Sequence, residues 1–90
     1  MTPLGYYLSP NYPNPFNPLT SVAFSLPRAQ RVKLSVYDAQ GRRVMTLVDG
    51  YRAEGVHEVT WDAGDMTSGV YFCRIEAGNF SAVQKMMLVK

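Results

Sequence analysis

The fold is decided by residues 32–48, which read VKLSVYDAQGRRVMTLV. In the first part of this stretch Val32, Leu34 and Val36 alternate with other residues, which is the two-residue period of a strand that buries one face. Residues 38–41 then supply Asp, Ala, Gln and Gly, of which Asp and Gly are typical of turns. A second run rich in β-branched residues follows. The stretch therefore predicts two strands joined by a tight turn.

The same pattern recurs on both sides of this stretch, where short β-rich runs are separated by Gly, Asp, Asn or Pro. The run that begins at Arg43 is expected to close at Asp49-Gly50. No window repeats apolar residues at helical spacing, so no helix is expected. The expected strands cover residues 6–8, 20–26, 32–37, 43–48, 56–61, 69–75 and 80–89.

Strands of this length and spacing predict an all-β protein, namely an immunoglobulin/fibronectin III-like antiparallel β-sandwich of about seven strands. A small closed barrel is the alternative. A chain of 90 residues has room for one hydrophobic core, so residues 1–90 are expected to form a single domain. Trp61 is in phase with Val59 and is expected in this core, as is Cys73.

Composition and charge disfavour two classes of partner. The sequence has nine Lys/Arg and seven Asp/Glu residues, and no basic cluster larger than Arg42-Arg43. Because a nucleic-acid backbone is bound through several phosphate contacts, nucleic acid is disfavoured as a partner. The apolar runs are only a few residues long, so no membrane insertion is expected. The first residues do not resemble a signal peptide, and any export signal is therefore expected upstream of this sequence.

The sequence offers no set of side chains that would carry out catalysis. Its one histidine, His57, is expected on the inward side of a strand, away from Glu54 and Glu58. Its one cysteine, Cys73, excludes an internal disulfide and a cysteine-based zinc site. We therefore expect no enzyme activity, no catalytic residue, no metal and no cofactor.

The sequence leaves two binding alternatives, a calcium site and a sugar-binding surface, each of which also has a structural interpretation. Asp62 and Asp65 flank a turn and offer oxygens to calcium, but Asp in a turn more often binds its own backbone two residues on. Trp61 and the tyrosines are able to form a sugar-binding platform if they are exposed. The register of Trp61 with Val59 favours the core instead.

Residues 9–18 contain four of the six prolines. Proline fixes φ, restricts the residue before it and lacks a backbone donor, so this segment is expected to be extended and to lie at the edge of a sheet. Tyr12 and Phe16 are expected to pack on that edge. The two Pro-x-x-Pro spacings are also found in ligands of aromatic-grooved domains, which is the functional alternative.

Five motifs, in order along the chain, resemble the C-terminal sorting domain of the type IX secretion system. They are NYPNPFNP at 11–18, VYDAQGRRV at 36–44, GVHEVTWD at 55–62, SGVYFCRI at 68–75 and KMMLVK at 85–90. Together they cover about residues 8–90. Part of the pattern is also similar to the immunoglobulin-like domain of flagellar hook-capping proteins.

The resemblance implies a non-catalytic sorting module at the C-terminus of a larger exported protein, with the passenger domain upstream. In that family the domain is recognised in the periplasm by type IX translocon components. The domain carries the cargo across the outer membrane to the cell surface or the medium and is typically cleaved off, and a sortase-like protease is implied as the enzyme that attaches the cargo to a surface lipopolysaccharide. A strand that ends at Lys90 beside a sheet edge is suited to β-augmentation or to capture of its end.

Carried over to this sequence, the sorting signal falls on three short segments. Each residue also has a structural explanation: Gly69 as a turn into a strand, Tyr71 as core, and Lys85 and Lys90 as charges that keep an edge soluble. Two other functions remain open, a structural or adhesive fibronectin-like spacer and an accessory carbohydrate-binding module of a secreted hydrolase. The sorting-signal candidates are Pro13, Asn14, Pro15, Gly69, Val70, Tyr71, Lys85, Leu88 and Lys90.

Overall fold

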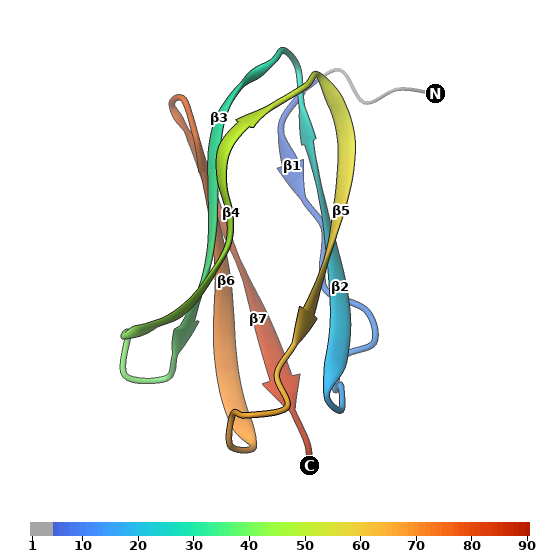
Figure 1. Ribbon diagram of the computed structural model, residues 1–90, viewed down its shortest axis with the longest axis vertical. Coiled ribbons are helices and arrows are strands. Elements are labelled where there is room, and N and C mark those ends of the chain that lie inside the picture. The colour runs from blue at the N-terminus through green and yellow to red at the C-terminus, as the bar shows by residue number, and fades with distance from the viewer. Residues whose placement is uncertain (1–4) are drawn as a thin grey trace.

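The structure, a computed structural model, describes residues 5–90, which form seven β-strands in two facing layers (Figure 1). Among these residues there is no helix that could cross a membrane. The strands are β1 (Tyr7–Leu8), β2 (Leu19–Leu26), β3 (Gln30–Asp38), β4 (Arg43–Arg52), β5 (Gly55–Asp62), β6 (Gly69–Ala77) and β7 (Phe80–Leu88).

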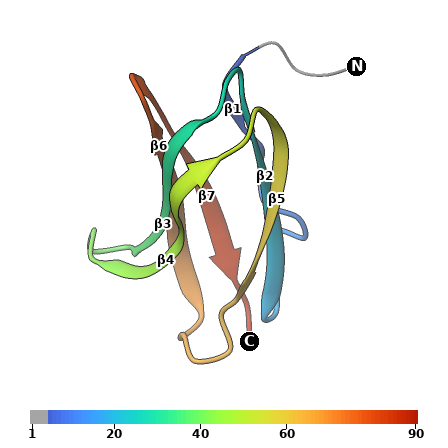
Figure 2. The ribbon, with the colours of Figure 1, turned by 45° about the horizontal axis from the view of Figure 1, so that its top comes forward.

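The strands divide into a three-stranded sheet, β1-β2-β5, and a four-stranded sheet, β4-β3-β6-β7, with every neighbouring pair antiparallel. Constant-type immunoglobulin domains place their fourth strand with the first, second and fifth. Here β4 pairs with β3 in the other sheet, which is a fibronectin III-like division. The predicted all-β sandwich is confirmed. In Figures 1 and 2 the turn between β3 and β4 projects away from the four-stranded sheet.

The core lies between the two sheets and is filled by the alternating positions of the strands. The buried hydrophobic residues of the strands are Leu8, Val22, Phe24, Leu26, Val32, Leu34, Val36, Val48, Trp61, Tyr71, Cys73, Ile75, Ala77, Met86 and Leu88. The predicted inward faces are thus confirmed. His57 and Val59, in phase with Trp61, are only half-buried because β5 is an edge strand.

Trp61 lies at the centre of an aromatic cluster that joins three parts of the chain. Its side chain is 3% exposed. The centroid of its ring system lies 5.6 Å from the ring of Phe16 and 5.5 Å from the ring of Tyr71, which it meets edge-on. Tilted and edge-on arrangements are the favoured geometries of aromatic pairs. The predicted core position of Trp61 is confirmed.

The end predicted for the fourth strand is wrong. Strand β4 passes through Asp49-Gly50 and continues to Arg52, with Asp49 opposite Lys33 and Gly50 opposite Val32. The reason is that β3 begins at Gln30 and offers backbone partners to the whole of this stretch. Backbone pairing with the first residues of β3 therefore overrides the turn tendency of Asp49-Gly50.

The turn predicted at residues 38–41 is present and is fixed by the carboxylate of Asp38. Its Oδ1 accepts hydrogen bonds from the backbone N–H of Gln40 at 2.9 Å and of Arg42 at 3.0 Å, and its Oδ2 accepts one from the Arg42 guanidinium at 2.9 Å. The hydrogen bond from the Arg42 backbone is the largest factor that holds the pKa of Asp38 below its ordinary value. The β3–β4 hairpin is thus closed by one acidic side chain.

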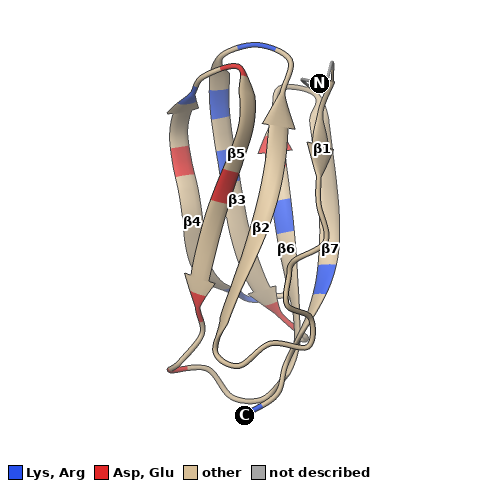
Figure 3. Cartoon of the chain, turned by 90° about the vertical axis from the view of Figure 1, so that its right-hand side faces the viewer, with Lys and Arg blue, Asp and Glu red and all other residues tan. Residues whose placement is uncertain are grey.

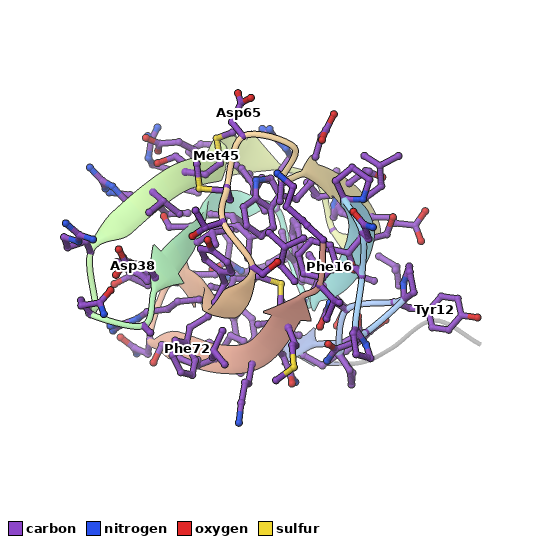
Figure 4. All side chains as sticks on the ribbon, turned by 90° about the horizontal axis from the view of Figure 1, so that it is seen from below. Tyr12, Phe16, Asp38, Met45, Asp65 and Phe72 are labelled. Atoms are coloured by element: carbon purple, nitrogen blue, oxygen red, sulfur yellow. The ribbon has the colours of Figure 1, made fainter. Side chains whose placement is uncertain are left out.

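The proline-rich segment differs from its prediction in two ways. It is bent at residues 13–15 and 17–18 rather than extended, and the peptide bonds that precede Pro13, Pro15 and Pro18 are cis. Phe16 is buried, but the side chain of Tyr12 is 82% exposed, so the expected packing of Tyr12 on the sandwich is wrong. Figure 4 shows Tyr12 pointing away from the molecule and Phe16 pointing into it. Only the backbone of Tyr12 pairs with the sandwich, through Ser21.

Candidate functional site

The three segments that carry the sorting-signal candidates meet at one end of the sandwich. The beginning of β6 pairs with the end of β7, where Gly69 lies opposite Leu88 and Val70 opposite Met87. Tyr71 lies opposite Met86 in the same register. Two of the three segments are therefore neighbouring strands, although they are distant in sequence.

The third segment reaches β7 through the side chain of Asn14. Its Nδ2 donates a hydrogen bond to the backbone carbonyl of Lys85 at 3.3 Å, and its Oδ1 accepts one from the backbone N–H of Met87 at 3.0 Å. An amide side chain thus supplies the donor and acceptor that a neighbouring strand would offer. Together with Pro15, these residues line a shallow hollow of about 280 Å³.

Phe16 continues this contact with its backbone. Its N–H donates to the carbonyl of Met87 and its carbonyl accepts from the N–H of Val89, both at 3.0 Å, which forms a parallel bridge opposite Leu88. The segment after β1 therefore runs along the end of β7, as Figure 3 shows. The sheet edge beside Lys90, which the sequence suggested as a place for β-augmentation, is occupied by the protein's own residues 14–16.

Two buried polar residues that sequence reasoning missed hold this segment in its bend. Asn11 is 3% exposed, and its Nδ2 donates to the Pro13 carbonyl at 3.2 Å and to Thr20 Oγ1 at 3.0 Å. Thr20 Oγ1 in turn donates to the same Pro13 carbonyl at 2.9 Å. The sequence carried no signal for this contact, because the common turn in which an Asn side-chain oxygen accepts the N–H two residues on is impossible when that residue is proline.

Lys90 is folded onto the loop between β5 and β6 rather than extended into solvent. Its Nζ donates to the carbonyl of Gly64 at 2.6 Å and to that of Met66 at 2.9 Å. Its backbone N–H donates to Ser68 Oγ at 2.9 Å. The same loop is tied to the core, since Tyr71 donates its hydroxyl to the Thr67 carbonyl at 2.7 Å. Lys90 therefore fixes the loop that leads into Gly69.

The nine candidates divide by exposure. Leu88 is 1% and Tyr71 5% exposed, so in the folded domain both side chains serve the core. Val70 is half-buried. The exposed candidates are Pro13, Asn14, Pro15, Gly69, Lys85 and Lys90. Seven of the nine positions are thus at least partly accessible at the surface of the folded domain.

Asp62, His57 and Cys73, the titratable residues that the sequence raised as candidates for chemistry, each have a structural partner or are buried. Asp62 Oδ1 accepts the N–H of Gly64 at 2.9 Å, as expected of a turn aspartate. His57 stacks on Phe24 with ring centroids 5.2 Å apart. Burial raises the pKa of the Cys73 thiol to about 12. Within residues 5–90 no three His, Cys, Asp or Glu side chains gather into a metal-binding group.

Comparison with known proteins agrees with this geometry. The fold is similar to part of a solved structure of PorZ, described as an essential bacterial surface component of the type IX secretion system of Porphyromonas gingivalis. The TM-score is 0.59 at 22% identity, over 96% of this chain and 12% of the length of that one. No curated protein matches the sequence. The family described as secretion system C-terminal sorting domain matches residues 11–90, and the chain belongs to that family.

Proposed function

We propose that residues 1–90 act as a non-catalytic sorting module that directs a larger exported protein through the type IX secretion system. The observation that carries the proposal is the convergence of the three candidate segments on one end of a folded domain of this family. The Asn14 side chain bonds the end of β7, and Lys90 bonds the loop before Gly69 through its ammonium and its backbone N–H. The signal is then a surface assembled by folding, not a linear peptide.

The proposed partners are components of the type IX translocon, a sortase-like protease and a passenger domain upstream. The module passes through the periplasm with its cargo, and the cargo reaches the cell surface or the medium. The exposed groups at this end, including the Lys85 side chain and the backbone of Gly69, are the groups available to a translocon component.

The test is a reporter that carries its own periplasmic export signal, fused to this domain in a type IX-competent bacterium. Deleting residues 85–90 is a poor control because it removes Met86 and Leu88 from the core. The sharper variant is the double substitution Lys85→Ala and Lys90→Ala. The matched control is Arg28→Ala with Arg52→Ala, which removes two exposed cations far from the candidate segments.

We expect surface or extracellular reporter with the native domain and with the control, and periplasmic reporter with the Lys85/Lys90 variant. Circular dichroism of each purified fusion domain verifies that it is folded. A native domain that folds but leaves the reporter in the periplasm contradicts the proposal and favours a fibronectin-like spacer. The sugar-binding alternative loses Trp61, which is buried, and would depend on exposed tyrosines such as Tyr51.

A further inference from the structure

The two sheets carry opposite charge. The strands of the three-stranded sheet contain no Lys or Arg among the described residues and two acidic residues, Glu58 and Asp62. The strands of the four-stranded sheet contain six basic and three acidic residues. Figure 3 shows this difference, with β1 and β2 free of blue and β5 carrying red. The basic residues are Arg31, Lys33, Arg43, Arg52, Arg74 and Lys85, and the acidic ones are Asp38, Asp49 and Glu76.

Much of this positive charge is not neutralised within the domain. Among the described residues Lys33 and Lys85 have no carboxylate within salt-bridge distance, and Arg74 reaches only Glu76, at 3.8 Å between two half-exposed side chains. Exposed pairs of this kind contribute little. The outer face of the four-stranded sheet therefore offers cations that are available to an external anion.

The same face has a hollow with an apolar side. Tyr37 of β3, Phe72 of β6 and Val83 of β7 lie on outward positions of adjacent strands, and Arg74 borders them. Asp38 also lines the hollow, but its carboxylate is paired with Arg42. The hollow has a volume of about 310 Å³. Val83, beside the two aromatic rings, is 54% exposed. In Figure 4 Phe72 lies on the outer side of the sheet, away from Phe16 in the core.

We propose that this outer face, named here the basic face (Lys33, Tyr37, Phe72, Arg74, Val83 and Lys85), docks an acidic protein partner. The partner inserts an apolar side chain between Tyr37, Phe72 and Val83, and its flanking carboxylates meet Arg74 and the two lysines. Apolar centres with charged rims are typical of such interfaces. The inference rests on the proposed sorting function, because the acidic partner is the same translocon component that binds the sorting signal, and the basic face is its second contact.

A protein surface fits the basic face better than an anionic membrane does. Membrane-binding surfaces insert protruding apolar side chains between lipids. Here the apolar residues line a hollow, which receives a side chain rather than penetrating a bilayer. Glu76 and Asp49 also interrupt the cations, which suits specific pairing more than attraction to a uniform negative surface.

The test uses two valines that are matched in position. Val83 on β7 and Val56 on β5 are both outward residues of edge strands and are 54% and 51% exposed, but they lie on opposite faces. Val83→Asp, Val83→Lys, Val56→Asp and Val56→Lys are compared in the reporter assay described above. Thermal unfolding of each domain verifies the fold. We expect Val83→Asp to reduce export at least about tenfold, because it sets a carboxylate against an acidic partner, and Val83→Lys to reduce it less.

Each result decides a separate claim. If Val83→Asp exports as well as Val56→Asp does, the basic face is not a docking surface, although the sorting function stands. If Val83→Lys is as defective as Val83→Asp, the partner is not acidic. If the native domain is not exported, the sorting function and the inference both fail. Sedimentation of the domain with phosphatidylglycerol vesicles at physiological salt tests the membrane alternative. If the native domain binds the vesicles and Val83→Asp does not, the basic face binds a membrane and the protein partner is refuted.

Discussion

Asn14 and Met87 are joined across 73 residues of sequence by a 3.0 Å hydrogen bond from the Met87 N–H to the Asn14 side-chain oxygen. The same amide donates to the Lys85 carbonyl. One side chain therefore completes part of the ladder of an edge strand, in a segment whose prolines have no backbone N–H to offer. This contact closes the end of β7 and brings the proline-rich segment into the candidate surface.

Asn14→Ala is expected to lower the free energy of unfolding by about 1 kcal/mol, since a typical intramolecular hydrogen bond contributes on that order and the site is exposed. Urea unfolding followed by circular dichroism measures the change. Asn17→Ala is the matched control, because Asn17 also precedes a proline and is exposed. Equal effects of the two substitutions would show that the pairing of Asn14 with β7 adds no stability.

Trp61→Ala is expected to lower the free energy of unfolding by about 3–5 kcal/mol, because it removes a buried aromatic side chain that contacts both Phe16 and Tyr71. That is a large fraction of the stability of a small domain. Val56→Ala, at an exposed position of the same strand, should change little. Before any mutagenesis, native Trp61 fluorescence should be insensitive to iodide, and efficient quenching would refute the buried position.

Cys73 is expected to resist thiol reagents unless the domain unfolds, because burial raises the pKa of its thiol from 9.0 to about 12. Between these two pH values the unfolded thiol ionises while the folded one keeps its proton. The stability contributed by the neutral thiol is therefore complete below pH 9 and falls as the pH rises, by about 1 kcal/mol for each pH unit.

The measurement compares the free energy of unfolding of the native domain with that of Cys73→Ala from pH 8 to pH 11. The difference between the two isolates the contribution of the thiol, because the two proteins share every other titratable group. Parallel pH curves for the two proteins, or rapid labelling of Cys73 at pH 8 without denaturant, would contradict its sequestered position.

Lys90→Ala is expected to loosen the loop between β5 and β6, because the Lys90 ammonium donates to the carbonyls of Gly64 and Met66. Hydrogen exchange at the Met66 amide, which donates to the Ala63 carbonyl, reports on this loop and should become faster. Lys85→Ala removes an exposed lysine from β7 and should leave the exchange rate unchanged. An unaltered exchange rate at Met66 in Lys90→Ala would show that the hydrogen bonds of the lysine do not stabilise the loop.

Much of the fold was accessible from the sequence because alternation is a local property. The alternation of Val32, Leu34 and Val36 predicts a buried face whichever strand lies beside it. The alternation of Met86 and Leu88 does the same for β7. Where the neighbour decides, local reasoning failed. Asp49-Gly50 stays in a strand because β3 is long enough to pair with it. Ser35 is buried although it lies on the outward side of β3, a position that alternation predicts to be exposed.

The candidate site was predicted in its parts but not in its assembly. The resemblance named Asn14, Gly69 and Lys90, yet nothing in their spacing shows that an amide would pair with β7 or that the lysine would fold back onto a loop. Asn11 was missed because its partners, the Pro13 carbonyl and the Thr20 hydroxyl, converge only after the proline-rich segment bends. Such contacts depend on the chain path rather than on the pattern of residue types.

The pairing of residues 14–16 with β7 also concerns how copies of the protein are made. During synthesis β7 is the last strand to be made. Asn14 and Phe16 therefore cannot form their hydrogen bonds with Met87 and Val89 until those residues have been added to the chain. A nascent chain halted by a premature stop codon, or one clipped by a protease before β7, lacks Met86 and Leu88 and cannot close the sandwich. The proposed sorting surface contains residues from both ends of the domain, so it forms only after β7 has been synthesised, and domains truncated before β7 would not present it to the export machinery.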